Sequence, residues 1–309
     1  MRVYCVLPPS VLMTDLAGPL DALRFATRFG VDLEVQVVSN VPQVASTCGI
    51  QLAGLKPLPD VLAEGDVLLI PGAVDETLAY QSAAGKALAQ WLRRVFDPAQ
   101  HQIITVCSGV FLLGAAGLLT GVKCTTHHNL LDDLRMQHPS AQVEANRVFV
   151  DDGAILTSAG VTAGFDVILY WLAQRFGTEV SLQVARHMNV YFRRTGNDTA
   201  LSPWLIARSH MHPAVHRVQD AIALGLHNSS DEVQDLNALA DIACVSSRHL
   251  TRIFKQHTGM TVHAYQLALR HAVFEQWRAQ GLSQEKSAIA AGFSSANAWR
   301  RSRSNAQAE

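Results

Sequence analysis

The sequence predicts two folded parts, an α/β domain with a doubly wound sheet and an all-α domain with two helix-turn-helix units. Three observations lead to this prediction. Over residues 1–195, apolar runs of strand length alternate with segments of helical spacing, which is typical of a parallel sheet covered by helices on both faces. Two similar pairs of short helices occupy residues 209–309. A polar stretch with Gly and Pro, residues 196–208, separates the two parts and predicts a linker.

Length and composition agree with two soluble domains. At 309 residues the chain exceeds the range in which one core keeps growing. No apolar stretch reaches the roughly 18 residues of a membrane helix, and Met1 leads straight into a strand rather than a signal peptide, so we expect a cytoplasmic protein. Five cysteines without CxxC spacing disfavour both a disulfide framework and a zinc site. We therefore expect no metal and no cofactor.

The α/β domain begins with a strand, a loop and a helix. Strands are expected over residues 3–7, 33–39, 67–72 and 103–107, with helices over 15–26 and 86–96. Residues 148–157 predict a hairpin with its turn at Asp152-Gly153. Helices over 164–176 and 178–192 are expected to close the domain.

Residues 103–119 place a cysteine between a buried strand and a helix-like Ala/Leu/Gly segment. Such a sharp turn presents the side chain of Cys107 at the carboxyl edge of the sheet. There the positive end of the following helix can stabilise a thiolate. A single cysteine is more often a buried, inert thiol, so chemistry and simple lining of a pocket both remain open.

Four segments are expected to meet at the carboxyl ends of the strands, where doubly wound sheets bind ligands. They are residues 15–19, 71–73, 107–109 and the loop with His127 and His128. Singly, each has an ordinary explanation, such as a helix N-cap for Asp15 or a strand-ending turn for Pro71-Gly72. Their location at one edge favours a ligand pocket formed by Asp15, Gly72, Cys107, Ser108 and His127.

Several motifs recur in this order in one superfamily. They are Asp15-Leu16-Ala17-Gly18-Pro19, Ile70-Pro71-Gly72, Val106-Cys107-Ser108-Gly109, Ala116-Gly117-Leu118-Leu119-Thr120-Gly121 and Thr125-Thr126-His127-His128. Residues 1–195 therefore resemble a ThiJ/PfpI domain, which has a flavodoxin-like, class I glutamine amidotransferase-like fold. The resemblance implies that Cys107 matches the nucleophile of its enzymes, Asp15 the acidic partner of the thiol, and the N–H groups of Ser108 and Gly72 an oxyanion hole. The Asp-Leu-Ala-Gly-Pro loop is similar to that of isocyanide hydratases.

The all-α part begins with an amphipathic helix over residues 213–226. Residues 235–255 then predict two short helices joined by a turn at residues 244–246, with Ser246 as N-cap. This layout is typical of a DNA-binding helix-turn-helix, although a plain pair of surface helices has the same pattern. The second helix is expected to present Ser247, Arg248, His249, Thr251 and Arg252 to DNA.

Residues 284–301 repeat the scheme, with a turn at Ala291-Gly292-Phe293. The helix after that turn would present Ser295, Asn297, Arg300 and Arg301. The runs Leu-Ala-x-x-Ala-x-Val-Ser-x-Arg-x-Leu-x-Arg-x-Phe-Lys and Ile-Ala-x-x-Gly-Phe-Ser-Ser make the two units resemble the AraC/XylS family. The resemblance implies two recognition helices in successive major grooves. Because the family's last helix and Phe-Arg-x-x-x-Gly-x-x-Pro ending do not follow Arg301, we expect the second unit to be less well packed than the first.

Together the two parts predict a transcriptional regulator that binds double-stranded DNA and senses a small metabolite. The resemblance implies that the effector belongs with the amino-acid or amine derivatives that such regulators tend to sense, and that the first domain forms a homodimer. Residues 209–309 hold ten Lys/Arg and eight Asp/Glu, about +2, against fifteen and eighteen, about −3, in the rest, which permits a nucleic-acid partner without establishing one. The alternative is a cysteine-nucleophile enzyme, hydratase-like or amidase-like, with a DNA-binding tail. Since a sensor needs no chemistry, we expect no enzyme.

Overall fold

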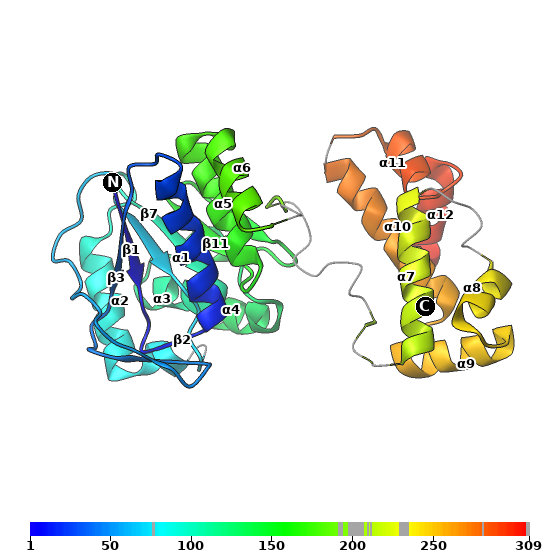
Figure 1. Ribbon diagram of the computed structural model, residues 1–309, viewed down its shortest axis with the longest axis horizontal. Coiled ribbons are helices and arrows are strands. Elements are labelled where there is room, and N and C mark those ends of the chain that lie inside the picture. Colours follow the sequence, from blue (N-terminus) through cyan, green and yellow to red (C-terminus); the bar gives the residue numbers. More distant parts are fainter. Residues whose placement is uncertain are drawn as a thin grey trace. The chain divides into compact units, whose positions relative to one another are not determined.

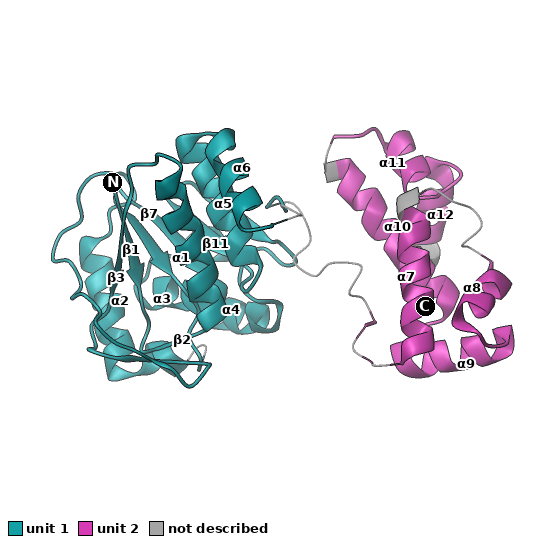
Figure 2. Cartoon of the chain, in the orientation of Figure 1, with its two compact units in different colours: residues 1–200 teal, residues 201–309 magenta. Residues whose placement is uncertain are grey.

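The computed structural model describes residues 1–75, 78–190, 194–196, 207–208, 210, 212–228, 235–279 and 281–306. The chain forms two compact units, residues 1–200 and 201–309, which are coloured separately in Figure 2. The predicted linker, residues 196–208, lies mostly outside the described residues. The exact boundary between the domains therefore stays a prediction.

Unit 1 is built on a six-stranded sheet with the order β10-β11-β7-β6-β1-β3 (Figure 1). All neighbouring strands are parallel except β10, which runs antiparallel to β11 and forms the predicted hairpin. Strand β6 is buried along its whole length, as expected for a strand covered on both faces. The strands are β1 (Arg2–Val6), β3 (Glu34–Val38), β6 (Val67–Ile70), β7 (Gln102–Val106), β10 (Phe149–Asp151) and β11 (Ile155–Ser158).

Helices cover both faces of this sheet, which confirms the predicted doubly wound fold. One face carries α1 (Met13–Arg28), α5 (Ala163–Phe176) and α6 (Thr178–His187); the other carries α2 (Ala83–Val95), α3 (Val110–Ala115) and α4 (Leu131–Gln137). None of the described helices has an apolar segment that could cross a lipid bilayer. The short elements are β2 (Ser10–Val11), β4 (Val44–Ser46), β5 (Gln51–Leu52), β8 (Lys123–Cys124), β9 (Gln142–Val143) and the 3-10 turns Leu78–Gln81, Cys107–Gly109 and His128–Leu130.

The winding direction of the chain reverses between β1 and β6. From β1 the chain crosses to β3 on one side, and then returns to β6, β7 and β11 on the other. Loops on either side of such a reversal diverge and leave room for a ligand at the carboxyl ends of the strands. Asp15, Gly72 and Cys107 follow β1, β6 and β7 at this edge.

Two predicted helix ends are wrong. The helix expected over 178–192 ends at His187, because Asn189 adopts a left-handed φ of 53° and the N–H of Val190 turns back to the carbonyl of Ala185 at 2.9 Å, a common helix stop. Residues 191 and 192 lie outside the described residues. The helix-like segment after Cys107 ends at Ala115 rather than at residue 119, close to Gly117 with its φ of 76°.

Unit 2 contains the two predicted helix-turn-helix pairs, joined by one long helix. Tyr265 and Leu269 of that helix, α10, are buried against the first pair, and Phe274 is buried against the second. The rings of Phe274 and Trp299 stack with centroids 4.0 Å apart, so the second pair has a buried cluster of its own. The helices are α7 (Pro213–Asn228), α8 (Leu236–Ala243), α9 (Ser247–Thr258), α10 (Val262–Ala279), α11 (Gln284–Ala290) and α12 (Ala296–Ala306).

Candidate ligand site and nucleic-acid interface

Cys107 lies at a strained elbow between β7 and α3, as the sequence predicts. Its φ is 56°, a left-handed conformation that is costly for a residue other than glycine. Gly109 completes the turn, because a β-carbon there would lie 2.4 Å from the carbonyl oxygen of Ile70. The side chain of Cys107 is buried, with 6% of the residue exposed.

Asp15 is neither part of a loop nor a helix N-cap, in contrast to the expectation from its local sequence. It is the third residue of α1, whose N-cap position is Leu12. Its fully buried carboxylate reaches across the sheet edge, and Oδ1 accepts the N–H of Val161 at 2.7 Å. Burial raises the pKa of Asp15 above its ordinary value, although the Val161 N–H, the Cys107 thiol and the Gly72 N–H oppose that shift.

Gly72 brings the loop after β6 against both groups. A β-carbon at this position would lie 2.5 Å from Oδ2 of Asp15 and 3.1 Å from Cβ of Cys107, so only glycine fits. Ser108 secures the same loop, because its buried Oγ accepts the N–H of Ala73 at 2.9 Å. The structure therefore brings together four of the predicted pocket residues, Asp15, Gly72, Cys107 and Ser108. The hydroxyl of Ser108 holds the loop after β6 in place.

His127 lies on the loop next to the elbow. The preceding residue, Thr126, donates its hydroxyl to the carbonyl of Cys107 at 2.8 Å. The half-buried His127 ring accepts the N–H of Asn129 at 3.4 Å and lies against His128, with ring centroids 4.1 Å apart. Burial, and then the charge of His128, lower the pKa of His127, which favours a neutral imidazole.

Sequence reasoning missed three residues that surround the thiol. A β-carbon at Gly160 would lie 2.6 Å from Cβ and 3.0 Å from Sγ of Cys107; Val161 binds Asp15 as described. Tyr80 is buried close by, and burial followed by the charge of Cys107 raises its pKa. The sequence feature that could have indicated Gly160 and Val161 is Ser158-Ala159-Gly160. This run of small residues follows a buried strand directly, as Pro71-Gly72 does.

In unit 2, helices α8 and α9 form the first predicted helix-turn-helix. Helix α8 ends at Cys244, which has a left-handed φ of 58°. Ser246 is the predicted N-cap of α9, and its Oγ accepts the N–H of His249 at 3.3 Å. Ser247 donates to Oδ1 of Asn237 at 2.6 Å, which joins the first turn of α9 to α8. The inner face of α9 is Leu250, Ile253 and Phe254, all buried.

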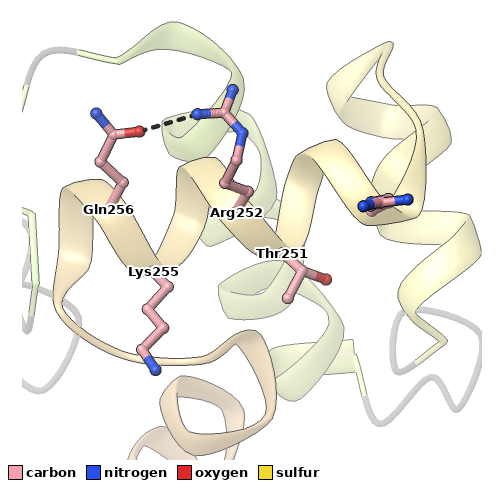
Figure 3. Close-up of a pocket in the computed structure, with 5 residues that line it drawn as sticks. Thr251, Arg252, Lys255 and Gln256 are labelled. Carbon is pink, nitrogen blue, oxygen red and sulfur yellow. Dashed lines mark hydrogen bonds between the residues drawn. The ribbon is translucent and has the colours of Figure 1, made fainter.

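The outer face of α9 is cationic and fully accessible. An open groove on it is lined by Arg248, Thr251, Arg252, Lys255 and Gln256 (Figure 3); His249 is exposed beside it and Ser247 is half-buried. Lys255 and Gln256 were not among the predicted contacts. The sequence of α9 contains no Asp or Glu, so nothing on the helix itself neutralises its positive charge.

The second unit repeats this arrangement on α12. Oγ of Ser295 accepts the N–H of Ala298 at 3.2 Å, while Asn297, Arg300 and Arg301 are exposed. Arg300 donates to Oδ1 of Asn297 at 2.8 Å and to Oε1 of Gln284 at 2.9 Å. Helix α12 also lacks acidic residues.

Four histidines gather where α7 begins and α9 ends. The ring centroid of His216 lies 4.5 Å from that of His210, and the His257 ring lies 5.8 Å from His210 and 4.6 Å from His212. Within the described ranges, no three such side chains are placed to hold a metal ion. Burial, followed by the charges of His216 and His257, lowers the pKa of His210.

Comparisons with known proteins agree with both units. Residues 1–174 match the DJ-1/PfpI family, and residues 239–303 match a helix-turn-helix domain. The HTH-type transcriptional regulator CdhR of Pseudomonas aeruginosa is 27% identical, over 97% of this chain and 87% of that protein. The isonitrile hydratase of Pseudomonas putida is 30% identical, over 59% of this chain and 75% of that enzyme. The crystal structure of a ThiJ/PfpI family protein from Pseudomonas syringae, 25% identical, covers 78% of this chain and 90% of its own with a TM-score of 0.53.

A flavodoxin-like domain with a cysteine elbow, followed by two helix-turn-helix pairs, defines a two-domain DNA-binding regulator. The chain belongs to the DJ-1/PfpI family and carries an AraC-type helix-turn-helix domain at its C-terminal end.

We expect Gly160→Ala to destabilise unit 1 more than Gly153→Ala. Both glycines have positive φ, 95° and 80°, but a β-carbon at Gly153 meets nothing within 4 Å. The difference in the free energy of unfolding, measured by urea denaturation, should therefore isolate the clash with Cys107 and be about 1–3 kcal/mol. Equal losses in the two variants would show that Gly160 does not pack against the thiol as described.

Unit 2 should lose stability as the pH falls from 7.5 to 5.5. His210 has a lowered pKa in the folded state, and its Nδ1 must be unprotonated to accept the N–H of His212 at 3.2 Å. Below a pH of about 6.5 the unfolded chain binds more protons than the folded chain, so acid favours unfolding. Calorimetry should show a smaller acid-induced fall in Tm for His210→Gln than for the wild type.

The matched control is His263→Gln, since His263 is exposed and lies on α10 outside the histidine cluster. Its Tm should fall with pH as much as that of the wild type. If His210→Gln shows the full wild-type pH dependence, the cluster does not cause the acid sensitivity.

Proposed function

We propose that this regulator reads its operator mainly with α9 and controls that binding through a small molecule held at the Cys107 site. The observation that carries the DNA-binding part is the exposed, acid-free face of α9, with Arg248, Arg252 and Lys255 side by side in helix-turn-helix geometry. We place the domain boundary in the linker, residues 196–208. We also propose that the protein works in the cytoplasm.

Each side chain of α9 has a role that its chemistry supports. An arginine that binds guanine with two hydrogen bonds contributes about 1–3 kcal/mol of discrimination, which suits Arg248 and Arg252. Lys255 is a point charge suited to phosphate. Ser247, His249 and Thr251 are short enough to contact base edges or phosphates where the helix lies deepest. We assign Ser295, Asn297, Arg300 and Arg301 of α12 the same task in the next major groove.

The effector site proposed in unit 1 is formed by Asp15, Gly72, Cys107, Ser108 and His127. Asp15 has no cationic partner in the hydrogen bonds described, so a ligand with an amine or amide N–H would gain from binding it. This agrees with an amino-acid or amine derivative as effector. We further propose that unit 1 forms a homodimer, because joining two weakly binding DNA-reading domains raises their effective concentration at paired half-sites.

An enzymatic activity is the second candidate, and the pairing of Asp15 with Cys107 together with the isonitrile hydratase relative supports it. A nucleophilic cysteine also needs free donors for a developing oxyanion. Here the N–H of Gly72 already faces the Asp15 carboxylate. We therefore favour a site that binds without chemistry.

Replacing Arg252 by alanine should weaken binding to DNA from upstream of the protein's own gene. Loss of a phosphate contact would reduce the salt dependence of log K by about one, whereas loss of a base contact would cost about 1–3 kcal/mol at one position. Gel-shift titrations at two salt concentrations separate these cases. The control is Arg24→Ala, which removes an exposed arginine from α1. If folded wild-type protein does not shift the DNA band at low salt, DNA binding is refuted. Equal DNA affinities of Arg252→Ala and Arg24→Ala would show that Arg252 does not contact DNA.

A thermal-shift screen of amino acids and amines should find compounds that raise the Tm of the wild type. A compound at about 100 times its Kd stabilises the folded state by about 2.7 kcal/mol. Cys107→Ser should keep this response and Cys107→Ala should lose it if the sulfur only makes a polar contact. The exposed Cys48 provides the control variant Cys48→Ser. Turnover of a hit that disappears in both Cys107 variants would instead support the enzyme.

A further inference from the structure

Three consecutive residues join the candidate ligand site to the point where the chain leaves unit 1. Gly160 packs against the thiol of Cys107. The N–H of Val161 binds Oδ1 of Asp15 at 2.7 Å. The hydroxyl of Thr162 accepts a hydrogen bond from Nη2 of Arg194 at 2.8 Å. We call residues 160–162 the coupling segment.

The coupling segment has a strained backbone that its surroundings must hold in place. Gly160 and Val161 have φ angles of 95° and 49°, and left-handed φ is costly for a β-branched residue such as valine. Packing of the Val161 side chain compensates for this strain only in part, since the residue is 42% exposed. The carbonyls of Gly160 and Val161 accept the N–H groups of the residues three positions later at 3.0 and 3.2 Å. The hydrogen bond to Asp15 is the contact that links this conformation to the candidate ligand site.

Arg194 is held at the other end by a buried acid. Asp166 is 4% exposed; its Oδ1 accepts the backbone N–H of Arg194 at 2.9 Å, and its Oδ2 accepts Nε at 2.9 Å and Nη2 at 2.7 Å. Two residues later Gly196 lies against β10, where a β-carbon would be 2.8 Å from the carbonyl oxygen of Phe149. The chain is thus fixed to unit 1 at the point where the predicted linker to the DNA-binding unit begins.

We propose that the coupling segment transmits the state of the Cys107 site to the linker by holding or releasing Arg194. A ligand that competes for Asp15 Oδ1 or displaces Gly160 removes the support of Val161, which relaxes to a negative φ and moves Thr162. Arg194 then loses its bond to Thr162 and is held by Asp166 alone, so that the chain is more easily released at the start of the linker. This inference rests on the proposed function and specifies the regulation of the same site.

Coupling between two sites is reciprocal. Releasing Arg194 must therefore also loosen the packing of the coupling segment against Cys107 and make the thiol more accessible. The test uses iodoacetamide as the probe of the thiol in the full-length protein, with labelling of each cysteine followed by mass spectrometry of its peptide. Thr162→Val removes the hydroxyl without removing a helix cap, because the Thr162 side chain makes no cap hydrogen bond. Asp166→Asn weakens the hold on Arg194 directly. We expect both variants to label Cys107 at least about five times faster than the wild type, the low end for coupled sites.

The matched control is Asp220→Asn. Asp220 pairs with Arg208, the last residue of the predicted linker, at 2.6 Å within unit 2. This variant should label Cys107 at the wild-type rate. The exposed Cys48 and Cys244 should react equally in all variants, and the buried Cys5 and Cys124 should stay unlabelled, which checks that each protein is folded.

If Thr162→Val and Asp166→Asn label Cys107 at the wild-type rate, the proposal is overturned. If Asp166→Asn does not fold, the rate at which Cys107 is labelled in Thr162→Val alone supports or overturns the proposal. A second measurement runs in the opposite direction: alkylation of Cys107 should speed hydrogen exchange at the Arg194 amide at least about fivefold, and an unchanged rate also overturns the coupling. Gel shifts test the proposed DNA binding separately, so loss of that function and absence of coupling are distinguishable.

Discussion

The close approach of four loops around Cys107 is the constraint on which the organisation of unit 1 depends. Glycine is required at three points where these loops approach one another most closely. Added β-carbons would lie 2.5 Å from Asp15 at Gly72, 2.6 Å from Cys107 at Gly160 and 2.4 Å from Ile70 at Gly109. Real side chains essentially never pack at such distances. The glycines after β6, β7 and β11 thus have one common cause, the crowding at the carboxyl edge of the sheet.

Two buried carboxylates near this edge are stabilised in different ways. Asp166 is paired with the guanidinium of Arg194 and accepts three of its N–H groups, so its charge is compensated. Among the described contacts Asp15 has only two backbone N–H groups and a thiol opposite it, and burial raises its pKa. A buried carboxylate without a cation is the weaker arrangement. Asp15 is therefore the carboxylate that a ligand in the proposed site would engage, while Asp166 is suited to a structural role.

The sequence predicts the sheet, the elbow and both helix-turn-helix pairs because their signals are local, in hydrophobic periodicity and capping residues such as Ser246. The missed features depend on distant contacts. Val161 belongs to the site through a hydrogen bond to a residue 146 positions away, and Asp15 is not an N-cap because α1 begins two residues before it. The end of α6 was missed because Asn189 signals a left-handed helix stop less strongly than glycine does.

The two helices proposed to read DNA, α9 and α12, also differ in the hydrogen bonds that already hold their arginines. Arg300 is held by hydrogen bonds of 2.8 and 2.9 Å to Asn297 and Gln284. Arg252 has longer contacts, 3.3 Å to Gln256 and 3.3 Å to His249. A side chain that binds DNA must exchange its existing hydrogen bonds for new ones, so only the surplus contributes to affinity. Arg252 gives up less than Arg300, and Lys255 adds a third cation to the same groove. This difference favours α9 as the principal DNA-reading helix, independently of any weakness in the packing of the second unit.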